Sequence, residues 1–263
     1  MTAYPLVVAD ATTMLRRNLR RMRRYPSLTF FIAGMPVVFL LLFVFVLGGT
    51  MGAGLGLVSG GRAEYTEYLM PGILVITIAG AAQGTAISVA MDKVEGIFAR
   101  FRTMDIARVA VLTGHVIGSV IQSMLAIGIV MVVGVLIGFR SDTGPIEWLA
   151  AAGLLALAAL AISWLSVALG MVSQSVETAS NIPMILILLP FLSSAFVPTD
   201  SLPDGLSWFA ENQPFTPLIE TIRGLLVGTP IGNSGILAVG WCVLIAVLGY
   251  VWARRLYDRD PAP

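Results

Sequence analysis

Six long runs of apolar residues constrain this chain more than any other feature of its sequence. A helix that crosses a bilayer needs about 20 mostly apolar residues, because the hydrocarbon core is roughly 30 Å thick. Only 12% of the residues are charged and 57% are hydrophobic, which excludes an ordinary soluble domain. We therefore expect residues 1–263 to form a single all-α transmembrane domain with six spans, at residues 28–47, 69–91, 109–139, 148–172, 182–197 and 236–256.

The fifth run, 182–197, is too short to cross a bilayer alone, because as a helix it would measure roughly 24 Å. The residues that follow, 200–228, contain three prolines and several charged side chains, which are costly in hydrocarbon. We expect them to form two short re-entrant helices that enter the bilayer from the outer side and return. The second would begin with Thr216 as N-cap and Pro217 at its first position.

The basic residues predict the orientation of the chain. Six spans place thirteen of the sixteen on one side of the membrane, in the N-terminal arm, residues 92–108 and the C-terminal tail. The positive-inside rule then places both termini in the cytoplasm. Residues 5–25 combine apolar residues at helical spacing with arginines, which favours an amphipathic helix on the inner leaflet over a solvated basic tail.

The sequence offers no constellation for catalysis or metal binding. Its single histidine, His115, has no second His, Cys or carboxylate at ligand spacing, so we expect it to serve in helix packing. The single cysteine, Cys242, lies within an apolar run. A P-loop requires Gly-Lys-Ser/Thr, whereas the only lysine, Lys93, precedes a valine. We expect no enzymatic site, and we interpret the glycine-rich residues 48–61 as an outer loop.

The segment DKVEGIFARFRTMDIARVAVLTGHVI, residues 92–117, resembles the cytoplasmic segment between the second and third spans of type-2 ABC export permeases, especially the daunorubicin-resistance branch. The matching residues are Gly96, Arg100, Phe101, Arg102, Ile106, Arg108, Ala110, Val111, Leu112 and Gly114. The chain departs from the pattern at Asp105, where the family usually has proline, and at His115, where it often has arginine or lysine.

A second stretch resembles the same family closer to the C-terminus. It contains a Phe-x-Pro-x-x-x-Leu-Pro element at residues 196–203, then Asn-x-Pro-Phe-Thr-Pro at 212–217 and a helix with Arg223. The resemblance implies that residues 200–228 are the outer re-entrant helices that cap the translocation path. The candidate residues of this outer gate are Phe196, Pro198, Pro203, Pro214, Thr216, Glu220 and Arg223. Glu220 and Arg223, three residues apart on one helix, are expected to support one another.

The resemblance also implies the partners. Residues 92–106 would form a cytoplasmic coupling helix that docks on an ATPase subunit through Glu95, Gly96, Phe98, Arg100, Phe101, Arg102 and Asp105. Two separate ATPase subunits would hold the ATP and Mg²⁺, and this chain would bind no cofactor. A second permease, identical or paralogous, would complete the path in a bacterial cytoplasmic membrane, and no nucleic acid is expected.

The sequence favours an exporter of a hydrophobic or amphipathic drug or antibiotic over three other functions. A lipid or glycolipid exporter of the same family remains the alternative, because apolar spans suit either substrate. An ion-coupled secondary transporter would be expected to carry ionisable residues at mid-membrane, where these spans offer Gln83, Gln122, Ser and Thr. An intramembrane enzyme would need a catalytic cluster that the sequence lacks.

Overall fold

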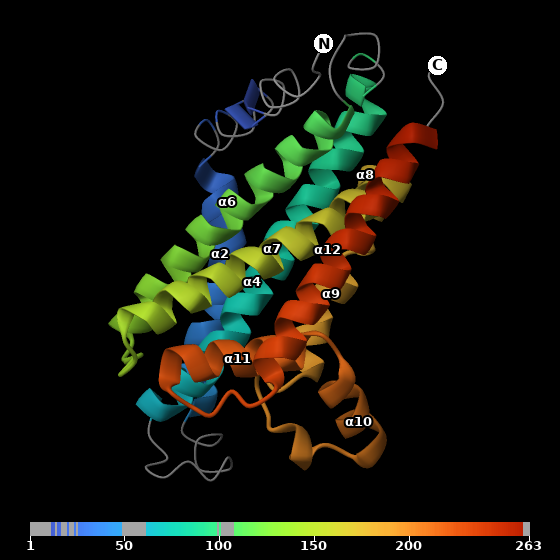
Figure 1. The fold of residues 1–263 in the computed structure, drawn as a ribbon. Helices are drawn as coiled ribbons and strands as arrows, with labels where there is room; N and C mark the ends of the chain where they lie inside the picture. The colour runs from blue at the N-terminus through green and yellow to red at the C-terminus, as the bar shows by residue number, and fades with distance from the viewer. Residues whose placement is uncertain are drawn as a thin grey trace.

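The computed structural model is a bundle of helices, and its described residues include no strand. It describes residues 26–48, 62–98, 100 and 108–259, together with residues 12, 13, 15, 16, 20 and 24. Five long helices run along the bundle (Figure 1): α2 (Pro26–Leu41), which continues into the π-helical turn η1 (Leu42–Leu47), α4 (Arg62–Val94), α6 (Arg108–Leu136), α7 (Pro145–Val172) and α12 (Ser234–Arg259).

The helices confirm the predicted all-α class. Among the described residues, four helices are long and apolar enough to cross a membrane: Ala63–Val94, Ala110–Leu136, Pro145–Val172 and Ser234–Arg259. They correspond to the second, third, fourth and sixth predicted spans. The first and fifth runs form shorter apolar helices, Ile32–Leu47 and Val176–Leu192. The predicted helix at 5–25 and the loop at 48–61 lie largely outside the described residues.

Prolines divide the fifth run into short pieces. Helix α8 (Val176–Asn181) lies just before the run, and the run itself forms α9 (Met184–Leu188) and the 3₁₀ helix η2 (Leu189–Leu192). Pro183 separates the first two and Pro190 lies in the third, since proline lacks the N–H that a continuous helix needs. Beyond them come η3 (Thr199–Ser201), α10 (Asp204–Asn212) and α11 (Phe215–Val227), so the chain forms two short α-helices where two were expected.

The predicted start of α11 is wrong by two residues. The helix begins at Phe215 with Pro214 as its N-cap, and no side chain caps it. Thr216 instead donates its hydroxyl to the carbonyl of Ala210, which joins α11 to α10. Pro217 falls in the first turn, where its missing N–H has no helical partner to lose. Gly228 ends the helix at φ 85°, a backbone conformation that favours glycine.

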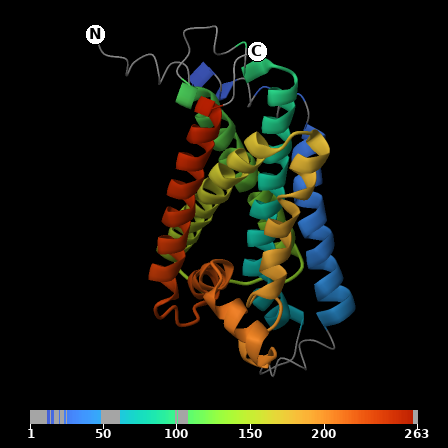
Figure 2. The same cartoon turned by 90° about the vertical axis from the view of Figure 1, so that its right-hand side faces the viewer.

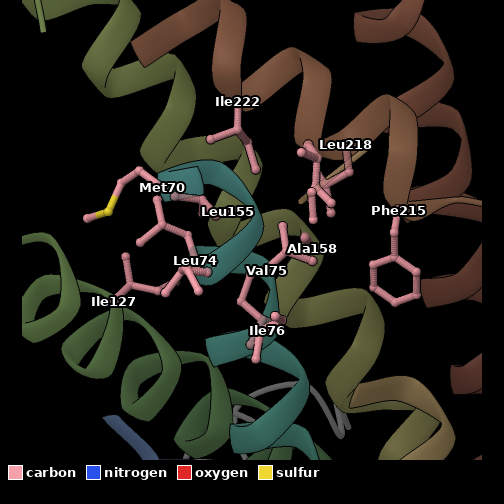
Figure 3. Packing of buried hydrophobic residues seen from close by; sticks show 14 of the residues in the cluster. Met70, Leu74, Val75, Ile76, Ile127, Leu155, Ala158, Phe215, Leu218 and Ile222 are labelled. Carbon is pink, nitrogen blue, oxygen red and sulfur yellow. The ribbon is translucent and has the colours of Figure 1, made fainter. Parts of the chain in front are cut away.

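Helix α4 lies at the centre of the core. Figure 3 shows Met70, Leu74 and Val75 of α4 facing Ile127 of α6, Leu155 and Ala158 of α7, and Leu218 and Ile222 of α11. Figure 2 shows α2 and α12 on opposite sides of the bundle. Helix α12 keeps much of its apolar surface exposed, including Val243, Val247 and Leu248. Such a surface suits a helix that faces lipid.

Glycines allow two pairs of helices to pack with their backbones close together. A Cβ added at Gly170 of α7 would lie 2.6 Å from the carbonyl oxygen of Ala86 on α4. A Cβ at Gly249 of α12 would lie 2.7 Å from the backbone nitrogen of Leu165 on α7. Small residues permit such approaches in membrane helix bundles. Helix α7 is therefore packed tightly against both α4 and α12.

Candidate functional site

The bundle has two ends, and polar contacts between helices gather at each. Residues 92–98, the start of α6 and the C-terminal end of α12 lie at one end, whereas α10, α11 and residues 137–144 lie at the other (Figure 1). At the first end, the α4–α6 junction consists of Asp92, Lys93, Phe98, His115 and Tyr257. At the second, the α11 junction consists of Tyr68, Ser194, Glu220, Arg223 and Ser234.

A buried carboxylate and imidazole connect α4 to α6. Oδ2 of Asp92 lies 3.1 Å from Nε2 of His115, and the two side chains are 5% and 6% exposed. Burying a carboxylate without a partner is costly, so this contact stabilises the position of α6 relative to α4. The sequence spacing showed no carboxylate near His115. The fold brings Asp92 to it from 23 positions earlier in the chain.

The next residue connects α4 to α7. Nζ of Lys93 donates to the carbonyl of Met171 at 2.6 Å and reaches that of Ser173 at 3.4 Å. Met171 lies in the last turn of α7, where helical carbonyls lack partners within the helix. A cation at that end also interacts favourably with the helix dipole. Two consecutive side chains of α4 thus bind two different neighbouring helices.

Phe98 fixes the chain just beyond α4. It is buried, and its ring meets His115 edge-on with centroids 6.4 Å apart and Tyr257 of α12 at 5.6 Å. Between Lys93 and Phe98 the chain turns at Gly96, whose φ is 70°. The junction therefore holds the chain on both sides of this turn.

The predicted coupling residues divide into three groups. Glu95 and Arg100 are exposed beside the turn at Gly96. Phe98 is buried within the bundle, so it anchors the segment instead of contributing to its exposed face. Phe101, Arg102 and Asp105 lie outside the described residues. The sequence interpretation missed Asp92, Lys93 and Tyr257 as contacts, and the unusual histidine at 115 was the one available signal.

Arg223 is the centre of the α11 junction. Its Nη2 donates to the carbonyl of Ser194 at 2.7 Å and to that of Tyr68 at 3.3 Å. Its guanidinium carbon lies 4.1 Å from the centroid of the Tyr68 ring, a cation–π contact. The Tyr68 hydroxyl donates to the same Ser194 carbonyl at 3.2 Å. Helix α11 is thereby tied to α4 and to the chain that follows η2.

The expected direct pair of Glu220 and Arg223 is not formed. The ion pairs among the described residues are Asp92–His115 and Arg254–Asp258. Glu220 instead accepts a hydrogen bond from the Ser234 hydroxyl of α12 at 2.9 Å. Arg223 extends towards Tyr68 of α4, and its Nη2 donates to the carbonyls of Tyr68 and Ser194. The two residues therefore connect α11 to different helices.

The other predicted gate residues lie near this junction or shape its chain. Phe196 stacks on Phe191 with centroids 4.8 Å apart and lies 4.6 Å from the Phe43 ring of η1. Three prolines stand immediately before short helices and so mark where each begins: Pro198 before η3, Pro203 before α10 and Pro214 before α11. These residues define the path of the chain and offer no reactive group.

Between the junctions, three hydroxyl groups join α4, α6 and α7. Thr85 donates to Ser119 at 2.6 Å, and Ser163 donates to the same oxygen at 2.8 Å. The described residues contain no cluster of His, Cys, Asp or Glu that could hold a metal ion. Other hydroxyls in the bundle, such as those of Thr77 and Thr221, bond to carbonyls of their own helices.

The chain is similar to a known family and to proteins of several bacteria. The family described as ABC-2 type transporter matches residues 10–227. The chain is 29% identical over 266 positions to the "Daunorubicin resistance ABC transporter permease protein DrrB1" of Streptomyces coeruleorubidus, covering 99% of this chain and 90% of that protein. It is 23% identical over 260 positions to the "Probable doxorubicin resistance ABC transporter permease protein DrrC" of Mycobacterium tuberculosis, covering 96% and 91%. It is 27% identical over 220 positions to "Nodulation protein J" of Rhizobium leguminosarum bv. viciae, covering 81% and 80%.

Proposed function

The chain belongs to the ABC-2 type transporter family, and on that premise we propose that it is the permease subunit of an ATP-driven exporter of hydrophobic or amphipathic drugs. The observation that carries the proposal is the match over 99% of the chain to a daunorubicin resistance permease. The substrate would leave the cytoplasm or the inner leaflet along a path formed with a second permease, identical or paralogous.

Separate ATPase subunits, two per complex, would supply the energy and would hold the ATP and Mg²⁺. Membership of the family supports this division of labour, as does the absence of Gly-Lys-Ser/Thr from the sequence. The coupling segment, residues 92–106, would dock on the ATPase. Glu95 and Arg100, exposed at the start of this segment, provide charges of both signs for such a contact.

In the proposed topology the chain crosses the membrane six times and keeps both termini in the cytoplasm. The apolar helices Ile32–Leu47 and Val176–Leu192 would provide the first and fifth crossings. Helices α10 and α11 would be the outer re-entrant pair that completes the short fifth span. The arrangement is supported by the common position of residues 92–98 and the end of α12, which carry basic residues, at the end of the bundle opposite α11 (Figure 1).

Two features favour an ATP-driven exporter over an ion-coupled transporter. Among the described residues, Asp92 is the only buried carboxylate, and it lies in the last turn of α4 instead of at mid-membrane. The three hydroxyl groups that join α4, α6 and α7, on Thr85, Ser119 and Ser163, do not ionise at physiological pH. Proton coupling within a membrane usually relies on ionisable groups there.

The proposal is tested by copurification and reconstitution. The permease is purified from its native membrane, the ATPase that accompanies it is identified, and both are reconstituted into vesicles with doxorubicin as the probe. Doxorubicin transport that requires ATP, and that stops when the ATPase is inactivated, is the expected result. Transport that persists with an inactive ATPase would overturn the energy source. Stimulation of ATP hydrolysis by added lipids, with none by doxorubicin, would overturn the substrate in favour of a lipid.

A further inference from the structure

We propose that Asp92, Lys93 and His115 are positioning residues that transmit movement of the coupling segment to α6 and α7. This inference rests on the proposed function, because it concerns how the permease would respond to its ATPase. It assigns a role to the α4–α6 junction that neither the sequence patterns nor the names of the relatives describe.

The contacts of the α4–α6 junction lead from the end of α4 to several other helices. Asp92 and Lys93 are neighbours at the end of α4, yet one binds His115 of α6 and the other binds the last turn of α7. Phe98 adds a contact with Tyr257 of α12. A displacement of the segment therefore acts on three helices through side chains, as well as on α4 and α6 through the backbone.

The contacts of the α4–α6 junction are buried and closely packed. The Asp92–His115 pair is buried, and breaking it would leave a carboxylate and an imidazole in apolar surroundings. Within the same cluster, Val111, Leu112, Met171 and Ala253 are also buried. Because close-packed interiors deform little, the ends of the four helices move as one unit when the segment moves.

The turn at Gly96, unlike the junction, is loosely packed. A Cβ at Gly96 would meet no atom within 4 Å, so the turn is not held by packing around this residue. Without the junction, the turn at Gly96 could absorb a movement by a change of backbone angles. The contacts of Lys93 before the turn and of Phe98 after it restrict that motion. They direct the displacement into the bundle instead.

The experiment measures how much doxorubicin is transported per ATP hydrolysed in vesicles that contain the permease and its ATPase. His115→Leu removes the partner of Asp92, and His115→Gln keeps a side-chain N–H near the position of Nε2. We expect the ratio to fall at least about fivefold in His115→Leu, within the usual range of coupling between sites, while ATP hydrolysis continues. His115→Gln should restore most of the ratio.

A merely structural role gives a different result. Loss of folded protein lowers ATP hydrolysis and transport together, and their ratio stays unchanged. Ser123→Ala is the matched control, because Ser123 is buried two turns further along α6 and its hydroxyl has no hydrogen-bond partner. Its ratio should equal that of the wild type. If His115→Leu does not assemble, Lys93→Met tests the same idea, because it removes the ammonium and keeps most of the side-chain volume.

The outcomes separate the two proposals. A wild-type complex that shows no ATP-dependent doxorubicin transport contradicts the proposed function. A wild-type complex that transports, combined with assembled His115→Leu or Lys93→Met variants of normal ratio, overturns the role of the junction and leaves the proposed function intact.

Discussion

At the scale of single residues, Arg223 shows how a charged side chain is accommodated inside an apolar bundle. Its Nη2 donates to the backbone carbonyls of Tyr68 and Ser194 and the guanidinium lies over the Tyr68 ring, while its buried Nε has no hydrogen-bond partner. The sequence predicted an ionic partner on the same helix, because helical spacing is the only geometry that a sequence displays directly. A backbone carbonyl that accepts from a side chain, such as that of Ser194 after η2, cannot be identified from the sequence, since every residue carries a carbonyl group.

The first prediction concerns this residue. Arg223→Ala should lower the free energy of unfolding by about 1–3 kcal/mol, because the carbonyls of Tyr68 and Ser194 lose a charged donor. Arg223→Lys keeps a charge but loses the planar group over Tyr68, so its loss should be smaller. The measurement is the thermal unfolding midpoint of the purified permease in detergent. Equal midpoints for the wild type and Arg223→Ala would show that the contacts contribute nothing.

The same limit of sequence interpretation applies to His115. Its departure from the family pattern was visible, but the partner lies 23 positions away on another helix. Only the packing of α4 against α6 brings the two side chains together.

At the scale of helices, periodicity and length predicted most of the fold, because a spanning helix must satisfy its own backbone hydrogen bonds. The runs at 69–91, 109–139, 148–172 and 236–256 all became long helices. The divisions of the fifth run followed from Pro183 and Pro190. The start of α11 did not follow, because Thr216 could satisfy the α10 backbone as readily as it could cap a helix.

The second prediction concerns the contact between α4 and α7. Gly170→Ala should destabilise the permease by about 1–3 kcal/mol, since the added methyl group would overlap Ala86 and overpack the interface. Gly153→Ala is the control on the same helix, because its added methyl group meets no atom within 4 Å. It should be neutral or stabilising, since alanine favours helices. Thermal unfolding of both variants checks the difference, and a Gly170→Ala variant as stable as Gly153→Ala would contradict the close packing.

At the scale of the whole molecule, an apolar core separates the polar contacts at the two ends of the bundle. Within that core, the hydroxyl groups of Thr85, Ser119 and Ser163 are hydrogen-bonded to one another. Charge patterning predicted which segments share an end, because basic residues cluster at one side of a membrane. The junctions themselves could not be predicted. Each combines residues from three or four helices, and their contacts depend on how far each helix extends beyond the core.

The third prediction tests the orientation. In a Cys242→Ser background, a cysteine at Asp204 should react with a membrane-impermeant thiol reagent in intact cells. A cysteine at Glu95 should react only after the membrane is opened. Both positions are exposed in the structure, so accessibility within the protein does not limit either reaction. Labelling of the Glu95 position in intact cells, without labelling at Asp204, would reverse the proposed topology.

The contact between Phe98 and Tyr257 also has a consequence for biosynthesis. Phe98 is synthesised well before α12. Its ring therefore lacks its contact with Tyr257 while α6, α7 and the short helices enter the membrane. The α4–α6 junction can therefore be completed only after α12 has been synthesised and has docked on α7 through Gly249. Nascent chains carry an unfinished junction throughout the intervening period of translation.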